Sequence, residues 1–223
     1  MQRLAIYDMD KTITRAPTWT RFLIHYAGAY APWRLALLPV AGLIAAGHPL
    51  RLINRAQLKA ATHRLLIGAH TRPGQLATAA ASFAAHEARR GLFPAALDQI
   101  TADRAAGYRI IVATASHHFY AEAIAALVGA DAVIATEAQR DARGRVLARL
   151  AGANCYGAAK LDRITAWLAH EGIARRDAQV RFYSDHISDA PTLGWADEGF
   201  VVNPDAALAS LARARGWKIL DWR

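Results

Sequence analysis

Eight polar residues of this chain stand where an apolar run ends or where a helical pattern begins, and four of them are carboxylates. The eight are Asp8, Asp10, Thr12, Thr114, Ser116, Lys160, Asp185 and Asp189. If the apolar runs are parallel strands of one open sheet, these side chains meet beyond the carboxyl ends of the strands. Carboxylates held that close repel one another unless a cation lies between them, so the pattern predicts a metal site. Ligands that are all oxygen atoms favour Mg²⁺ over zinc.

Short β-branched runs alternate with amphipathic helical patterns over most of the chain. The expected strands cover residues 4–7, 108–114, 132–136, 180–184 and 200–202. The expected helices cover residues 94–106, 117–128, 157–170 and 205–215. Residues 146–150 are expected to pair with the preceding segment through the Arg143-Gly144 turn. This alternation predicts an α/β fold, with a Rossmann-like, doubly wound and mainly parallel sheet covered by helices on both faces.

Residues 15–88 have a different texture, rich in Ala and Leu and without a run of period two. They are expected to form helices separated by Pro32, His48-Pro49 and Pro73-Gly74. This block interrupts the sheet after its first strand. We therefore predict a catalytic core made of residues 1–14 and 89–223, with residues 15–88 as an inserted α-helical cap.

The positive charge is concentrated in that inserted block. The net charge is +9, yet residues 13–86 contain eight Lys and Arg and no Asp or Glu, while the rest of the chain has nineteen basic and eighteen acidic residues. A single-sign region of this length is a candidate docking surface for an anionic partner, and the alternative is a solubilising face. No aromatic-basic RNA motif and no helix-turn-helix signature is present, so no nucleic acid partner is expected. A non-catalytic nucleic-acid or membrane binder stays the alternative from another class.

Cys155 is the single cysteine, so no internal disulfide can form, and this suits a reducing cytoplasm. Residues 1–7 contain no apolar run of signal-peptide length. We therefore expect a cytoplasmic protein. Because no dedicated base is in view for Cys155, we expect a small packed residue there and not a nucleophile.

Four short motifs resemble those of phosphatases of the haloacid dehalogenase superfamily. Asp8-Met9-Asp10-Lys11-Thr12 resembles the first motif, Thr114 the second, Lys160 the third, and Ser184-Asp185-His186-Ile187-Ser188-Asp189 the fourth, in the same order along the whole chain. The helical block resembles that superfamily's cap of the first type, C1. Further stretches resemble subfamily IB, which is related to the phosphoserine phosphatases: Thr114-Ala115-Ser116, Asn154-Cys155-Tyr156-Gly157 and Val202-Asn203-Pro204. Lys11 departs from the pattern, because many members have glycine there.

The resemblance implies a role for each residue. Asp8 would attack a phosphate monoester and form an aspartyl-phosphate, while Asp10 would give and then take a proton. Magnesium would be held by Asp8, the backbone carbonyl of Asp10 and Asp185, and Asp189 would orient these ligands. The phosphate would be bound by Thr12, Thr114, Ser116 and Lys160. Asp10 favours phosphate over halide chemistry, because a halide leaves without a proton.

The sequence indicates the type of reaction more clearly than the identity of the substrate. Phosphoserine phosphatases hold the substrate's ammonium with an acidic cap residue, and residues 13–86 contain none, which leaves only Glu87 as a remote candidate. Phosphoserine or another small soluble phosphomonoester is therefore the alternative and not the first choice. A phosphotransferase that uses the same aspartyl-phosphate also stays open, because only the acceptor differs.

Residues 35–50 form a run without Lys, Arg, Asp or Glu, flanked by Arg34 and Arg51. This run is shorter than the ~20 residues of a helical membrane span, and Pro39 interrupts it. One interpretation is a helix buried in the core of the cap, or a dimer contact. The other is an interfacial segment that lies on an anionic bilayer. With the four motifs and this apolar cap segment, the chain resembles the bacterial phosphatases that act on phosphatidylglycerophosphate. The second interpretation predicts an anionic, lipid-linked phosphomonoester and a peripheral contact with the inner membrane face.

Overall fold

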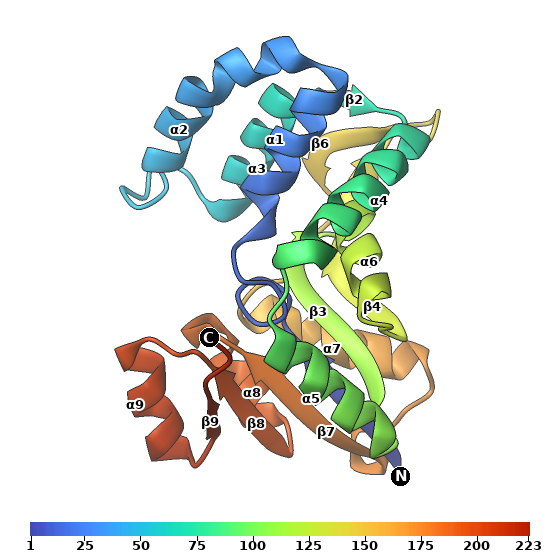
Figure 1. The fold of residues 1–223 in the computed structure, drawn as a ribbon, viewed down its shortest axis with the longest axis vertical. Helices are drawn as coiled ribbons and strands as arrows, with labels where there is room; N and C mark the ends of the chain where they lie inside the picture. The colour runs from blue at the N-terminus through green and yellow to red at the C-terminus, as the bar shows by residue number, and fades with distance from the viewer.

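The computed structural model describes residues 1–223 and contains a six-stranded sheet in the order β4-β3-β1-β7-β8-β9 (Figure 1). All neighbouring strands in this sheet are parallel. The strands are β1 (Gln2–Tyr7), β3 (Arg109–His117), β4 (Ala132–Thr136), β7 (Ala178–Ser184), β8 (Glu198–Val202) and β9 (Lys218–Leu220). The chain leaves β1 toward β3 and β4 and later returns to the other side of β1 with β7. The carboxyl ends of β1 and β7 therefore meet at the point where the strand order reverses, where open α/β sheets bind ligands.

Both faces of the sheet are covered by helices, which explains why β1 is a continuous apolar run. Ala5 and Tyr7 belong to one core cluster, and Leu4 and Ile6 belong to a second cluster on the opposite face. All four side chains are fully buried, because successive side chains of a strand point to opposite faces. The helices that connect the strands of this sheet and cover its two faces are α5 (Pro94–Ala105), α6 (His118–Leu127), α7 (Ala158–His170), α8 (Ala190–Trp195) and α9 (Ala206–Arg215). The expected doubly wound α/β fold is confirmed.

Between β1 and β3 the chain forms a helical segment that lies beyond the carboxyl edge of the sheet (Figure 1). Its elements are α1 (Thr18–Tyr30), the short 3-10 helix η1 (Pro32–Leu37), α2 (Leu38–Ala46), α3 (Arg55–Leu66) and α4 (Pro73–Arg90). Local sequence explains several starts. Pro32 and Pro73 stand in the first turn of η1 and α4, where a missing N–H costs no helical hydrogen bond. Asn54 and Gln57 form a capping box at the start of α3.

A small antiparallel sheet joins this helical segment to the second half of the chain. Its order is β2-β6-β5, with β2 (His70–Thr71), β6 (Val146–Leu150) and β5 (Ala138–Arg140). The expected pairing of residues 146–150 with the preceding segment is confirmed by the β5-β6 ladder. The ladder between β2 and β6 adds that this hairpin also pairs with the inserted segment. The division into residues 15–88 and the remainder stays a prediction.

The apolar run at residues 35–50 is not buried in the core of the helical segment. In α2 only Ala41 is buried, while Leu43 is 76% exposed, and Leu50 and Leu52 in the following loop are 70% and 74% exposed. The interpretation of this run as a buried core helix is therefore wrong, because apart from Ala41 its side chains stay partly or largely accessible to solvent. No helix combines the length and the apolar composition that crossing a bilayer requires.

Candidate active site

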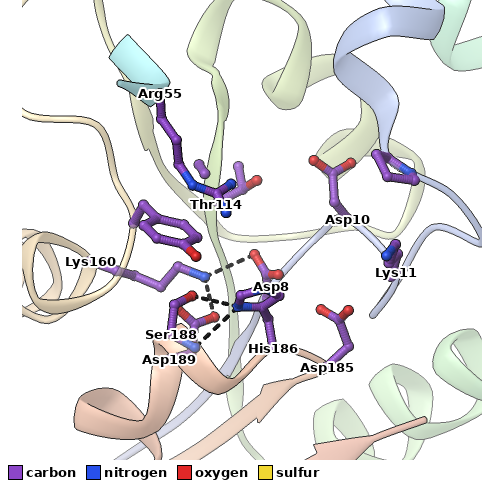
Figure 2. Close-up of a pocket in the computed structure, with 13 residues that line it drawn as sticks. Asp8, Asp10, Lys11, Arg55, Thr114, Lys160, Asp185, His186, Ser188 and Asp189 are labelled. Carbon is purple, nitrogen blue, oxygen red and sulfur yellow. Dashed lines mark hydrogen bonds and ion pairs between the residues drawn. The ribbon is translucent and has the colours of Figure 1, made fainter. Parts of the chain in front are cut away.

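Six of the eight polar residues singled out in the sequence line one pocket at the carboxyl edge of the sheet (Figure 2). The pocket has a volume of about 300 Å³. Strand ends supply most of the set, α7 supplies the lysine in its first turn, and the 3-10 helix η3 (Ile187–Asp189) supplies the last carboxylate. The six are Asp8, Asp10, Thr114, Lys160, Asp185 and Asp189.

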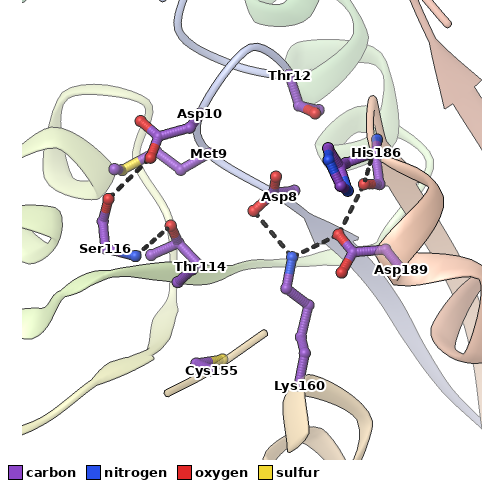
Figure 3. A network of polar contacts seen from close by, with 12 residues as sticks. Asp8, Met9, Asp10, Thr12, Thr114, Ser116, Cys155, Lys160, His186 and Asp189 are labelled. Atoms are coloured by element: carbon purple, nitrogen blue, oxygen red, sulfur yellow. Dashed lines mark hydrogen bonds and ion pairs between the residues drawn. The ribbon is translucent and has the colours of Figure 1, made fainter. Parts of the chain in front are cut away.

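Lys160 is the cation at the centre of this cluster. Its Nζ lies 3.0 Å from Asp8 Oδ1 and 2.6 Å from Asp189 Oδ2, and the lysine is 2% exposed (Figure 3). Ser184 Oγ donates a further hydrogen bond of 2.7 Å to Asp189 Oδ2. Burial alone would lower the pKa of Lys160, but the carboxylates of Asp189 and Asp8 raise it above its ordinary value. The lysine therefore stays charged beside the two carboxylates.

One ammonium does not balance the negative charge of this pocket. Burial raises the pKa of Asp8 to about 8; Lys160 opposes this rise, while Asp189, Asp185 and Asp10 add to it. Burial likewise raises the pKa of Asp185 to about 6, against the opposing charge of Lys11. Asp189 Oδ1 is buried and has no hydrogen-bond partner. These observations fit a bound cation, which would stabilise the carboxylates in their charged form.

The oxygen atoms available in the pocket suit magnesium, which keeps part of its water shell, better than a metal ion that is bound by side chains alone. No three His, Cys, Asp or Glu side chains of the chain gather closely enough to hold a metal ion by themselves. Mg²⁺ commonly binds one or two carboxylates and keeps several waters, so two aspartates and a backbone carbonyl are a sufficient protein contribution. Asp8 and Asp185 are two of the four carboxylates that line the pocket (Figure 2).

The Asp10 carboxylate is held on the side of the pocket away from Lys160. Thr18, the first residue of α1, donates to Asp10 Oδ1 from its backbone nitrogen at 2.8 Å and from Oγ1 at 2.7 Å. Ser116 Oγ donates to Asp10 Oδ2 at 2.9 Å (Figure 3). Tyr120 OH donates in turn to Ser116 Oγ at 2.6 Å. Asp10 is therefore oriented jointly by the helical segment and by β3.

Two of the predicted phosphate ligands have side chains outside the pocket lining. Thr12 is fully buried, and its Oγ1 lies 3.5 Å from Asp185 Oδ1. Ser116 is 2% exposed and its hydroxyl donates to Asp10. Both hydroxyl groups therefore contact the aspartates, whereas Thr114 lines the pocket. Direct binding of phosphate by the two buried hydroxyl groups stays a prediction.

Lys11 occupies a backbone conformation that explains why glycine suits this position. Its φ is 59°, in the left-handed region, where a side chain costs about 1 kcal/mol and glycine costs less. The Lys11 side chain is exposed and lines the pocket, and its charge lowers the pKa of Asp185 against the effect of burial. The departure from the glycine pattern thus adds a cation to the rim of the site.

Four further polar side chains line the pocket to which the sequence analysis assigned no role: Arg55, Tyr156, His186 and Ser188. Arg55 begins α3, and its guanidinium lies 4.1 Å from the centre of the Tyr156 ring. One turn later, Lys59 Nζ donates to Asn154 Oδ1 at 2.8 Å and to the backbone carbonyl of Ala115. The sequence contained signals that could have identified three of the four. Arg55 lies in residues 13–86, which contain no Asp or Glu, and His186 and Ser188 lie within the fourth motif.

Cys155 and Glu87, which the sequence analysis considered for functional roles, are both buried in the interior of the protein. Cys155 is fully buried, its thiol lies 3.7 Å from the Ile134 carbonyl oxygen, and burial raises its pKa to about 11. Glu87 is also fully buried, and its Oε1 lies 2.6 Å from Arg21 Nη2, outside the pocket. A thiolate nucleophile is therefore not favoured at Cys155, and Glu87 is not placed to hold a substrate's ammonium.

Comparison with known proteins points to one family. The model for haloacid dehalogenase-like hydrolases matches residues 5–194. A histidinol-phosphatase of Neisseria meningitidis serogroup C is 29% identical over 119 residues, which are 53% of this chain and 54% of that protein. Phosphoserine phosphatase SerB1 of Mycobacterium tuberculosis is 33% identical over 118 residues, which are 53% of this chain and 37% of that protein. Protein CicA of Caulobacter vibrioides is 30% identical over 195 residues, 87% of this chain and 83% of its own. This chain thus spans about half or less of the length of the first two relatives.

Solved structures show the same architecture. A protein of unknown function from Bordetella pertussis Tohama I aligns over all of both chains with a TM-score of 0.88 and 26% identity. A phospho-aspartyl intermediate analogue of phosphoserine phosphatase aligns over 100% of this chain and 94% of its own, with a TM-score of 0.64 and 16% identity. The second similarity establishes the shared phosphoserine phosphatase-like fold.

Proposed function

The chain belongs to the haloacid dehalogenase-like hydrolase family, and we propose that it is a magnesium-dependent phosphatase that cleaves phosphomonoesters through an aspartyl-phosphate at Asp8. One observation carries this proposal. Asp8 lies between Lys160, which binds it at 3.0 Å, and Asp10, which is held apart by its own hydrogen bonds (Figure 2). The nucleophile thus has a charge-neutralising cation on one side and a proton carrier on the other.

In the first proposed step, Asp8 attacks phosphorus and an oxygen–phosphorus bond forms while the ester oxygen–phosphorus bond breaks. Asp10 donates a proton to the departing alcohol oxygen. In the second step a water molecule attacks the aspartyl-phosphate, Asp10 takes its proton, and Asp8 is released together with inorganic phosphate. Lys160 stays bound to Asp8 and Asp189 and offsets the charge of the phosphoryl oxygens, and Thr114 donates a hydrogen bond to one of them.

Magnesium, when bound, would neutralise charge on the phosphate and on its ligands. We propose that Asp8, the backbone carbonyl of Asp10 and Asp185 hold it. The buried and unpartnered Oδ1 of Asp189 supports a position for Asp189 behind these ligands. We propose that Thr12 and Ser116 position Asp185 and Asp10 through the contacts that their hydroxyl groups make.

The charges around the pocket favour an anionic substrate. The helical segment contributes Arg55 and no carboxylate to the lining, and Lys11 adds a second cation at the rim. A substrate with a free ammonium would find no acidic partner on this segment, because Glu87 is buried against Arg21. We therefore place phosphoserine and other small soluble phosphomonoesters second, behind substrates that carry further negative charge.

The exposed apolar surface of η1, α2 and the loop that follows α2 supports a lipid-linked substrate. It consists of Trp33, Val40, Leu43, Leu50 and Leu52, each between 44% and 76% exposed. Exposed Arg51 stands within it, and no acidic residue is present nearby in the sequence. Apolar side chains flanked by arginine suit the boundary of an anionic bilayer. We propose an anionic lipid phosphomonoester such as phosphatidylglycerophosphate as substrate, for a cytoplasmic protein that contacts the membrane face peripherally, and the exposed surface equally supports a dimer contact.

Release of inorganic phosphate from a panel of monoesters tests the function. The panel contains p-nitrophenyl phosphate, phosphoserine, histidinol phosphate and phosphatidylglycerophosphate in vesicles, each with and without Mg²⁺. We expect Mg²⁺-dependent turnover that Asp8→Asn abolishes, with the lipid preferred over the soluble esters. Full activity of Asp8→Asn would overturn the assignment of the nucleophile. Phosphate that appears on an added alcohol and not in solution would identify a phosphotransferase.

A further inference from the structure

A second cationic cavity lies where the chain passes between the sheet and the helical segment. The two crossings run side by side, because Thr14 and Leu92 form an antiparallel bridge and the Arg15 N–H donates to the Gly91 carbonyl at 2.7 Å (Figure 1). The cavity beside them has a volume of about 410 Å³. Its lining contains no apolar residue and consists of Arg15, Arg21, His86, Arg89, Arg90 and Gly91.

The positive charge in this cavity is not balanced by the protein. Glu87 is the carboxylate that contacts these arginines, and it pairs with Arg21 at 2.6 Å while fully buried. Arg89 and Arg90 are exposed at the end of α4 and form no ion pair or hydrogen bond through their side chains. Four guanidinium groups and one carboxylate leave three net positive charges, apart from His86. Like charges gathered in this way attract an anion.

Two of the four arginines are already held in place by the protein. Arg15 Nε donates to the Leu92 carbonyl at 3.0 Å, and its guanidinium lies 5.2 Å from the centre of the Phe93 ring. Arg21 is held by Glu87, whose carboxylate packs against Gly91 so closely that any side chain at position 91 would collide with it. Cations fixed before a ligand arrives lose less freedom on binding than mobile side chains do. The fixed positions of Arg15 and Arg21 distinguish the cavity from a basic surface whose side chains are all mobile in solvent.

We infer that this cavity, which we call the hinge site, binds a compact soluble polyanion that carries two or more phosphate groups. Guanidinium groups bind phosphate oxygens through pairs of hydrogen bonds, and the three net positive charges of the cavity match an anion with more than one phosphate group better than a single dianionic phosphate. The volume corresponds to more than ten water molecules at ~30 Å³ each, so the cavity has room for an anion larger than orthophosphate.

The hinge site is distinct from the catalytic pocket but lies next to it. Arg15 also lines a neighbouring cavity that contains Lys11, Asp185 and His186, and these three residues line the catalytic pocket as well. A ligand that contacts Arg15 on the first crossing, Arg21 in α1 and Arg89 at the end of α4 would join that crossing to the helical segment. Occupancy of the hinge site would therefore fix the helical segment relative to Lys11 at the rim of the catalytic pocket.

Calorimetric titration with pyrophosphate in magnesium-free, low-salt buffer tests the hinge site without relying on activity. The three proteins are the wild type, Arg89→Ala/Arg90→Ala, and Arg213→Ala/Arg215→Ala. The third is a matched control, because it removes two exposed arginines from the last turn of another helix, α9. We expect the control to match the wild type and the Arg89→Ala/Arg90→Ala protein to bind pyrophosphate at least about tenfold more weakly. Orthophosphate should bind the wild type more weakly than pyrophosphate does.

Equal affinity of all three proteins for pyrophosphate would overturn the proposal, because binding would then occur elsewhere, including the catalytic pocket. An equal loss in both double variants would overturn it as well, by showing a response to net charge alone. Vesicles of phosphatidylglycerol distinguish a soluble ligand from a lipid headgroup. Loss of vesicle binding in Arg89→Ala/Arg90→Ala with unchanged pyrophosphate binding would replace the soluble polyanion with a membrane contact.

Discussion

Replacing Asp8 with asparagine should make the metal-free protein more stable while it abolishes catalysis. The Asp8 carboxyl group is buried among three other carboxylates, and Lys160 compensates it only in part. Asparagine at this position would keep the size of the side chain and remove the ionisable group. The prediction is opposite in sign to the usual effect of changing a buried residue, because most substitutions destabilise a protein.

The size of the effect follows from the pKa of Asp8, which is raised from 3.8 to about 8 in the folded protein. The folded state holds the proton in a pH range where the unfolded chain has released it. Stability of the metal-free wild type therefore falls as pH rises from about 4 to about 8, by about 1.4 kcal/mol per pH unit. Over the whole range this amounts to about 6 kcal/mol, and Asp8→Asn should recover a large part of it at pH 7.5.

Urea unfolding in EDTA at several pH values between 5 and 8 measures the difference. The stability advantage of Asp8→Asn should grow with pH and shrink when Mg²⁺ is added, because binding stabilises the wild type. Asp162→Asn is a matched control, since Asp162 is exposed and its side chain forms no ion pair. If metal-free Asp8→Asn is less stable than the wild type at pH 7.5, or if wild-type stability rises from pH 5 to pH 8, the charge argument for this pocket is refuted.

Three further predictions concern the site, the surface and the core. Ser116→Ala should lower kcat for p-nitrophenyl phosphate by about tenfold with little change in KM, because Asp10 loses one of its donors; an unchanged kcat would contradict this. Leu43→Glu/Leu50→Glu should abolish sedimentation with anionic vesicles and leave hydrolysis of p-nitrophenyl phosphate unchanged, because both side chains are exposed and neither lines the pocket; retained sedimentation would count against the membrane contact. Asp103→Ala should lower the unfolding free energy in urea by about 3–5 kcal/mol, because this buried carboxylate binds Tyr7, Tyr183 and Arg181; a loss below about 1 kcal/mol would contradict it.

The position of the proposed catalytic residues could be predicted because it depends on strand ends. Asp8 follows a run whose last four side chains are apolar and buried, and such runs are typical of buried parallel strands. Asp185 follows a strand that ends in the buried residues Phe182, Tyr183 and Ser184. The orientation of the hydroxyl groups could not be predicted in the same way. Ser116 lies in a part of β3 where the register with β4 shifts between Ala113 and His117. That irregularity directs Ser116 toward Asp10, and no pattern of residue types signals it.

Other features were missed because tertiary context decides them. β2 has two residues and gains its pairing only from β6, which is more than seventy residues away. The apolar run in α2 has the composition of a buried helix, yet Leu43 is exposed because no element covers that side. The hinge site combines arginines from both ends of the helical segment, and only the side-by-side course of the two crossings brings them together.

The helical segment does more than cover the pocket, because it supplies contacts on which the catalytic geometry depends. Thr18 at the start of α1 gives Asp10 two of its three hydrogen bonds, and Lys59 of α3 binds the carbonyl of Ala115 beside Thr114. Arg55 projects into the pocket one turn before Lys59. A substrate group bound by Arg55 would therefore pull on the same helix that contacts the end of β3 through Lys59. Under the proposed function, recognition of the substrate and orientation of the proton carrier both depend on the helical segment, and a change in its position would alter both together.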